Sequence, residues 1–227
     1  MNLVSLSGKR ILVTLAHEFM GPALCQRFSE LGAVVIASRD AVIGHEAPQE
    51  IVRAAGNVDA LVLNLGIPAP RTPAASIEEN EWRDVFAHMV DPLPRFTRAI
   101  LPQMIERRRG KILLIGSASA LRGMPATASY SAARAAQIGF VQAVGVELAK
   151  HQIQVNAIAQ NFVANPVYYP PEVAQNPKFQ ERLKREVPLG RLVTAEEDTA
   201  FAAYLCTDAA DCFVGQVFPL CGGWVAR

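Results

Sequence analysis

Short apolar runs alternate with longer segments of helical periodicity along the chain. Apolar runs bounded by polar or glycine positions are typical of strands buried on both faces of a parallel sheet. The predicted strands are Arg10–Leu15, Ala33–Ser38, Ala60–Leu65, Lys111–Gly116, Gln154–Ile158 and Gln216–Leu220. Apolar residues spaced by three and four positions predict the helices Gly21–Leu31, Ile51–Ala55, Glu78–Met89, Arg95–Arg108, Ser129–His151 and Ala195–Thr207. The alternation indicates βαβ units and a doubly wound parallel sheet flanked by helices.

Local signals refine this pattern at two helix starts and at one loop. Ser76–Glu79 and Thr194–Glu197 match the capping box, in which a hydroxyl and a carboxylate satisfy amides at a helix start. The segment Asn161–Asn176, rich in Pro and Tyr, follows the strand Gln154–Ile158. Because ligands bind outside the carboxyl ends of strands in open parallel sheets, we expect this segment to cover a site.

Composition supports one globular domain over residues 1–227 with a Rossmann-like α/β fold. Hydrophobic residues make up 51% of the chain and charged residues 19%, which excludes a disordered chain. The formal net charge of +1 gives no broad positive field, so we expect neither nucleic acid nor membrane as a partner. The local basic run Arg107–Lys111 is interpreted as a solvated helix end.

The cysteines and apolar runs exclude further classes. Cys25, Cys206, Cys212 and Cys221 lie far apart without a CxxC pair, so we expect no metal site and no disulfide framework. No stretch has the ~20 continuous apolar residues of a membrane span, and the first residues lack the pattern of a secretory leader. We therefore expect a soluble, cytoplasmic protein.

Three residues are candidates for catalysis. Ser117 follows a predicted strand, and Tyr130 and Arg134 are one helical turn apart, so all three can face one cleft. A fixed cation favours the ionised form of a neighbouring tyrosine, and a guanidinium stays protonated. We expect Tyr130 as general base, Arg134 as the cation that tunes it, and Ser117 as the hydrogen-bonding anchor of a substrate oxygen.

The spacing of these residues resembles the short-chain dehydrogenase/reductase superfamily over nearly the whole chain. Tyr130 follows Ser117 by thirteen residues, and a basic residue follows four positions later. Supporting motifs are Leu63–Gly66, Trp82–Met89, Asn156–Ile158 and Cys221–Trp224. The resemblance implies a single Rossmann-like domain.

Three cofactor-related positions depart from that family. Its dehydrogenases have a TGxxxGxG loop after the first strand, where glycines allow a pyrophosphate to approach the backbone. Here Thr14–Gly21 keeps only Gly21, with Leu15 and Phe19 in place of the other glycines. Arg134 stands where the family has a lysine that also binds the nicotinamide ribose. Met89 replaces the asparagine of the usual tetrad.

This combination is similar to the halohydrin dehalogenases. The resemblance implies cofactor-independent ring closure, in which a vicinal halo-alcohol gives an epoxide, a halide and a proton. It also implies reversal with azide, cyanide or nitrite, neither nucleotide nor metal as cofactor, and a homotetramer built on Glu78–Arg108 and Ser129–His151. It assigns the halide and substrate site to Phe19, Gln160, Asn161, Phe162, Val163 and Tyr169. Gln160 stands where that family commonly has proline.

Other interpretations stay open. The chain is alternatively an NAD(P)-dependent reductase with a degenerate loop, in which Arg39 or Asp40 contacts the adenosine ribose, or a non-catalytic ligand-binding homologue. Phe19 is alternatively a core residue. Because Tyr168 and Tyr169 are adjacent, we expect at most one of them to face the site. Trp224 packs at an oligomer interface or reaches a neighbouring active site.

Overall fold

The structure is a computed structural model that describes residues 4–226. Its sheet has six parallel strands in the order β2-β1-β3-β4-β5-β6. The strands are β1 (Arg10–Val13), β2 (Val34–Ala37), β3 (Ala60–Leu63), β4 (Gly110–Ser117), β5 (Ile153–Gln160) and β6 (Val217–Leu220). The predicted Rossmann-like α/β sheet is confirmed, and each predicted strand exists.

Eight α-helices are assigned within the described residues. They are α1 (Gly21–Glu30), α2 (Ala47–Ala55), α3 (Glu79–Met89), α4 (Pro92–Arg107), α5 (Ala128–Leu148), α6 (Pro171–Ala174), α7 (Pro177–Glu186) and α8 (Ala195–Leu205). Short 3-10 turns are η1 (Ala74–Ser76), η2 (Ala118–Ala120), η3 (Ala149–His151) and η4 (Asp208–Ala210).

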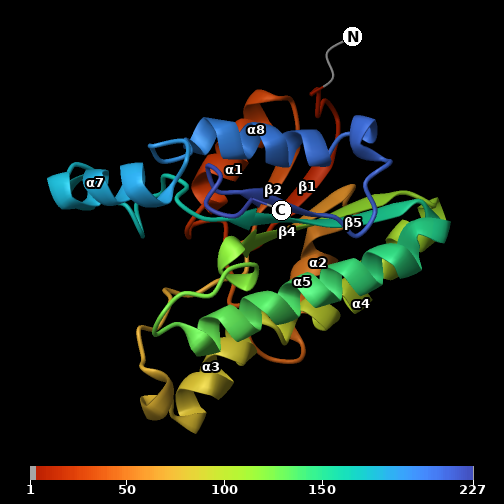
Figure 1. Cartoon of the computed structure of the whole chain (residues 1–227). Helices are drawn as coiled ribbons and strands as arrows, with labels where there is room; N and C mark the ends of the chain where they lie inside the picture. The colour runs from red at the N-terminus through yellow and green to blue at the C-terminus, as the bar shows by residue number, and fades with distance from the viewer. Residues whose placement is uncertain (1–3, 227) are drawn as a thin grey trace.

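The helices cover both faces of the sheet (Figure 1). On one face α2, α4 and α5 bury side chains such as Phe96 and Met104 against the strands. On the other face α1 and α8 do so through residues such as Leu24 and Phe28. Alternate residues of β4 enter opposite cores, with Ile112 on the α5 side and Leu113 on the α8 side, as expected for a strand buried on both faces.

The helix boundaries correct several sequence predictions. α2 begins at Ala47 and α4 at Pro92, several residues earlier than predicted, because proline at the first or second position is compatible with a helix start. The capping box at Thr194–Glu197 is confirmed. The one at Ser76–Glu79 is wrong: Ser76 belongs to η1, and α3 has no side-chain cap.

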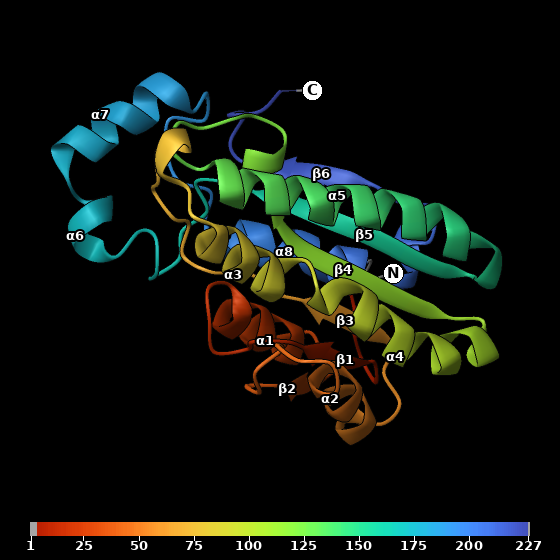
Figure 2. The ribbon, with the colours of Figure 1, turned by 90° about the horizontal axis from the view of Figure 1, so that it is seen from below.

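The segment after β5 contains structure that the sequence did not predict. α6 lies inside the predicted irregular stretch, and α7 follows it with Asn176 as N-cap, accepting from the Lys178 amide. Figure 2 shows α6 and α7 projecting beyond the carboxyl ends of the strands. This position agrees with the expectation that residues after β5 cover a site there.

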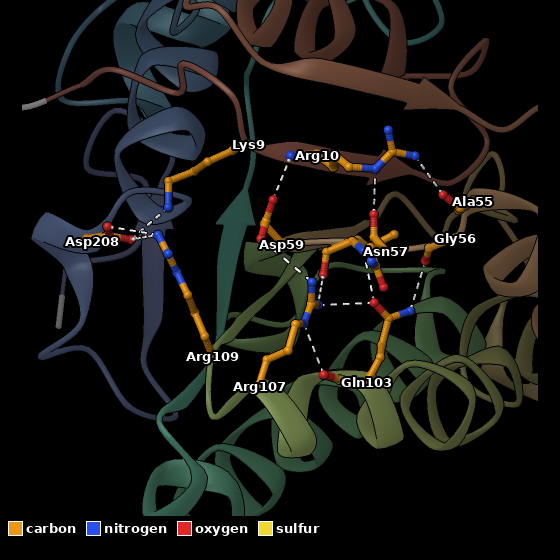
Figure 3. Close-up of polar contacts among 11 residues, drawn as sticks. Lys9, Arg10, Ala55, Gly56, Asn57, Asp59, Gln103, Arg107, Arg109 and Asp208 are labelled. Carbon is orange, nitrogen blue, oxygen red and sulfur yellow. Dashed lines mark hydrogen bonds and ion pairs between the residues drawn. The ribbon is translucent and has the colours of Figure 1, made fainter.

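The basic run at the end of α4 has exposed arginines, which also make polar contacts with neighbouring segments. Arg107 donates to the Val58 carbonyl at 2.6 Å, and Arg109 and Lys9 both pair with Asp208. Figure 3 shows these contacts, together with those of Arg10 and Asp59. The predicted solvated helix end holds for the arginines, whereas Lys111 is buried in β4 and pairs with Asp211.

Two glycines of α5 provide a matched test of how closely this helix packs on the sheet. A Cβ at Gly145 would lie 2.5 Å from the Gly215 Cα and 2.9 Å from the Val155 carbonyl, whereas a Cβ at Gly139 meets nothing within 4 Å. We expect Gly145→Ala to lower the free energy of unfolding by about 1–3 kcal/mol or more. Gly139→Ala should leave it unchanged or raise it by up to about 1 kcal/mol, the helix-propensity gain. Urea unfolding measures both, and equal effects would contradict the packing.

Candidate active site

One cavity of about 260 Å³ opens at the carboxyl ends of the strands, where the strand order reverses between β1 and β3. It brings together all of the predicted catalytic and halide-site residues. They are Ser117, Tyr130, Arg134, Phe19, Gln160, Asn161, Phe162, Val163 and Tyr169. The lining also includes Asn64, Gly66, Arg71, Tyr168, Val173 and Arg182, and none of the lining residues is Asp or Glu.

Ser117 is held by a residue that the sequence did not single out. It ends β4, and its Oγ lies 2.9 Å from the Oγ of Ser119 and accepts the Ser119 amide at 3.2 Å. Ser119 is buried in η2. These contacts fix the Ser117 oxygen at the end of its strand and use part of its hydrogen-bonding capacity.

Arg134 is a buried cation that no carboxylate contacts among the described residues. Its Nη1 donates to the carbonyls of Leu65 at 2.9 Å and Ile115 at 3.2 Å, and to the Gln137 Oε1 at 2.9 Å. Its Cζ lies 5.0 Å from the centroid of the Tyr130 ring. The guanidinium is therefore anchored by neutral acceptors, and its charge stays available to the tyrosine and the cavity.

The neighbours of Arg134 explain two residues of the family motifs. A Cβ on Gly66 would lie 2.8 Å from the Arg134 Nη2, so glycine leaves space for the guanidinium. Gln137, one turn further along α5, also donates to the Met89 carbonyl at 2.7 Å. Met89 itself is buried beside Tyr130 and contributes this backbone oxygen rather than a polar side chain.

The loop between β1 and α1 does not fit a dinucleotide in the manner of the family's glycine loop. Leu15 and Phe19 adopt left-handed φ angles of 44° and 46°, yet both carry large side chains. Phe19 reaches the cavity, where its ring is stacked on Tyr168 at 5.8 Å. The Asn64 amide donates to the carbonyls of Leu15 and Glu18 and holds the loop closed. The aromatic ring thus takes space that close approach of a pyrophosphate requires.

The segment after β5 presents two hydrogen-bond donors without partners among the described residues. The Asn161 Oδ1 accepts the Phe162 amide at 3.0 Å, but the Asn161 Nδ2 is buried and donates to no described acceptor. The Val163 amide donates to no described acceptor either. Phe162 between them has a left-handed φ of 52°. Since buried N–H groups are almost always paired, two donors without described partners beside the cavity are unusual.

Aromatic side chains surround this segment. Phe162 packs against Tyr169 with ring centroids 6.3 Å apart, and against Trp224 at 6.1 Å. Trp224 is therefore buried within its own chain behind the segment, rather than turned towards a neighbouring subunit. Burial raises the pKa of the Tyr169 hydroxyl to about 12, so it remains a hydrogen-bond donor.

The expectation that only one of Tyr168 and Tyr169 faces the site is wrong. Both line the cavity, because they lie in an irregular turn rather than in a strand with alternating side chains. The Tyr168 hydroxyl donates to the Ile67 carbonyl at 3.2 Å and accepts the Ala69 amide at 3.2 Å. Burial raises its pKa, and the neighbouring Tyr130 raises it further.

Sequence reasoning missed a buried carboxylate behind the cavity wall. Asp198 of α8 is fully buried, and the Gln160 Nε2 donates to its two oxygens at 2.7 and 2.8 Å. Burial raises the Asp198 pKa to about 7. Its place in the first turn of α8, beside Glu196 and Glu197, makes it resemble an acid that stabilises a helix start, so the sequence offers no signal of its burial.

Comparisons with known proteins identify the class. The family model described as Enoyl-(Acyl carrier protein) reductase matches residues 36–225. A 3-oxoacyl-[acyl-carrier-protein] reductase FabG of Pseudomonas aeruginosa is 31% identical over 97% of this chain and 98% of its own. A putative ketoacyl reductase of Streptomyces coelicolor is 33% identical over 76% of this chain and 69% of its own. The chain therefore belongs to this family, within the short-chain dehydrogenase/reductase superfamily.

Solved structures of other proteins are also similar to this chain. A structure described as "Dehalogenation enzyme" is 32% identical, with a TM-score of 0.90 over 97% of this chain and 99% of its own. A gluconate 5-dehydrogenase from Burkholderia cenocepacia, in complex with NADP and tartrate, has a TM-score of 0.88 over 99% of this chain and 98% of its own. At 23% identity it shows the common fold alone.

Neither a metal-binding cluster nor a membrane-spanning helix is found among the described residues. Within residues 4–226, no group of three or more His, Cys, Asp or Glu side chains is arranged to hold a metal ion. None of the helices described here is long and apolar enough to cross a membrane.

Burial of Asp198 predicts a pH-dependent cost to stability. Because its pKa is raised from 3.8 to about 7, the native state holds a proton that the unfolded chain loses in that interval. Stability contributed by this group falls as pH rises from about 4 to about 7, and the full cost remains above that. We expect Asp198→Asn to stabilise the protein by about 2–4 kcal/mol more at pH 8 than at pH 4. Chemical unfolding across this range measures the difference, and a gain independent of pH would contradict the assignment.

Proposed function

We propose that this protein is a halohydrin dehalogenase, which converts a vicinal halo-alcohol into an epoxide, a halide and a proton without a cofactor. The observation that carries the proposal is the arrangement of the cavity. Ser117, Tyr130 and Arg134 line it together with Asn161 and Val163, whose N–H donors have no partner among the described residues. The Phe19 ring takes space that a dinucleotide needs. The neighbour described as "Dehalogenation enzyme" supports the proposal.

The proposed reaction assigns a role to each side of the cavity. Ser117 holds the substrate hydroxyl, and Tyr130 accepts its proton as the oxygen attacks the neighbouring carbon. The carbon–halogen bond breaks, and its electron pair leaves with the halide. Arg134 supplies positive charge beside the ring of the base. The halide is held by the Asn161 amide, the Val163 N–H, and the edges of Phe19 and Tyr169. In the opposite direction azide, cyanide or nitrite would open the epoxide.

A second candidate is an NAD(P)-dependent reductase. The names of the sequence relatives favour it over the dehalogenase, since they are 3-oxoacyl-[acyl-carrier-protein] and ketoacyl reductases. We rank it second because Leu15 and Phe19 replace glycines of the cofactor loop and Arg134 replaces the lysine that binds the nicotinamide ribose. Arg39 and Asp40 follow β2, and one or the other would contact the adenosine ribose in this case. A non-catalytic ligand-binding homologue is a third alternative, which predicts binding without turnover.

Halide release tests these alternatives directly. Purified protein given a vicinal bromo-alcohol should release bromide without added nucleotide, and Tyr130→Phe should lower the rate by about 10²–10⁴-fold. Tyr204→Phe is the matched control, because that hydroxyl bonds the Ala209 carbonyl away from the cavity and its loss should leave the rate unchanged. Release that requires NAD(P)H, or oxidation of NADPH by a 3-oxoacyl thioester, would favour the reductase.

We also propose a homotetramer that uses α3, α4 and α5 as a major contact surface. Trp82 is 40% exposed and stacks on Phe86 with ring centroids 4.8 Å apart, and Val146 of α5 is 71% exposed. Exposed apolar side chains on neighbouring helices are suited to helix packing between subunits. Light scattering should give four times the 24.6 kDa chain mass, and a monomer would contradict this assembly.

A further inference from the structure

The buried carboxylate of Asp198 lies next to the proposed halide site, where a negative charge is unfavourable for an anion. Asp198 is fully buried, and the Gln160 Nε2 is the only side-chain donor to it among the described residues. An ionised carboxylate in a medium of low dielectric would repel a halide in the adjacent cavity. Either the halide stays out or the carboxylate loses its charge when the halide enters.

Gln160 connects Asp198 to the cavity. It ends β5 and pairs in register with Ser117, so the two side chains leave the sheet on the same face. It lines the cavity and directly precedes Asn161, whose Nδ2 has no described partner. Its Nε2 serves the carboxylate, and its Oε1 accepts no hydrogen bond from the described residues.

The protonation state of Asp198 therefore decides how the Gln160 amide is used. An ionised carboxylate only accepts hydrogen bonds, so it holds the NH₂ group of the amide. A protonated carboxyl can donate to the Gln160 Oε1, which allows the amide to rotate and present its NH₂ group to the cavity. Protonation thus removes a negative charge and frees a donor, and both changes favour an anion.

We propose that Asp198 and Gln160 couple halide binding to the uptake of one proton, so that the cavity binds a halide together with H⁺. No covalent bond between heavy atoms changes in this step. A proton from solvent adds to an Asp198 oxygen as the halide enters, and both leave together. The inference rests on the proposed function, because it names the state of the site that holds the leaving halide.

The surroundings of Asp198 leave burial as the main influence on its charge. Burial raises its pKa to about 7, opposed only by the hydrogen bond from Gln160. Ionisable side chains on α8 and on the elements packed against it are Glu196, Glu197, Tyr204, Cys25, Arg27, Glu30, Lys111 and Asp208. None of them contributes to the shift in the Asp198 pKa. A halide in the neighbouring cavity would add a negative charge, which is expected to raise the Asp198 pKa further.

Calorimetric titration with sodium bromide tests the coupling without relying on turnover. Repeating it at pH 8 in buffers of different ionisation enthalpy gives the number of protons taken up per bromide. We expect this number to approach one for the wild type, with the dissociation constant rising up to tenfold between pH 7.5 and 8.5. Asp198→Asn should bind bromide without proton uptake and with an affinity that is constant between pH 6 and 8.5.

Two controls separate the sources of any proton. Glu196→Gln removes an exposed acid from the same helix and should behave as the wild type. Tyr130→Phe should retain the uptake, because the proposed proton is on Asp198. Bromide binding without proton uptake in the wild type, or undiminished uptake in Asp198→Asn, would overturn the coupling while leaving the dehalogenase proposal intact. If the wild type binds no bromide even at pH 6, the proposed function fails, and the coupling fails with it.

Discussion

The cation at Arg134 is the interaction on which the rest of the cavity depends. Its guanidinium is held by the carbonyls of Leu65 and Ile115 and by Gln137, all neutral acceptors. A carboxylate in their place would neutralise the positive charge beside the Tyr130 ring. The segment after β3 and the end of β4 supply the two carbonyls and α5 supplies Gln137, so the packing of α5 on the sheet fixes the cation beside the Tyr130 ring. Gly66 leaves the space in which it lies.

A second constraint on the ligand is steric: side chains at the β1–α1 loop limit the space in the cavity. The β1–α1 loop has left-handed residues where glycine is the ordinary choice, and the large side chain of Phe19 turns into the cavity. The segment 161–163, on another side of the cavity, has buried N–H groups without described partners. An anion the size of a halide satisfies such donors without the extended groove of a dinucleotide. The names of the sequence relatives favour a reductase, whereas the Phe19 ring in the cavity favours a site for a halide.

Much of this arrangement could be predicted from the sequence, because periodicity and spacing are local properties. The six strands and the Ser117–Tyr130–Arg134 spacing were identified in this way. The contacts that depend on distant segments were not: Gln137 of α5 gains its role only beside Leu65 and Met89, and Asp198 of α8 only beside Gln160 of β5. Asp198 is the clearest case, since an acid in the first turn of a helix is ordinary and its burial depends on packing against the sheet. The adjacent Tyr168 and Tyr169 misled the prediction for a related reason, because a turn does not alternate its side chains.

In the proposed dehalogenase, a halide takes the position that a nicotinamide cofactor would take in a reductase. Anomalous diffraction from crystals soaked in bromide, with NADP present in a parallel soak, tests it most directly. We expect a bromide peak within contact distance of the Asn161 Nδ2, the Val163 amide and the Phe19 ring, and no ordered nucleotide at the β1–α1 loop. An ordered NADP with its nicotinamide beside Tyr130, and no bromide in the cavity, would contradict it.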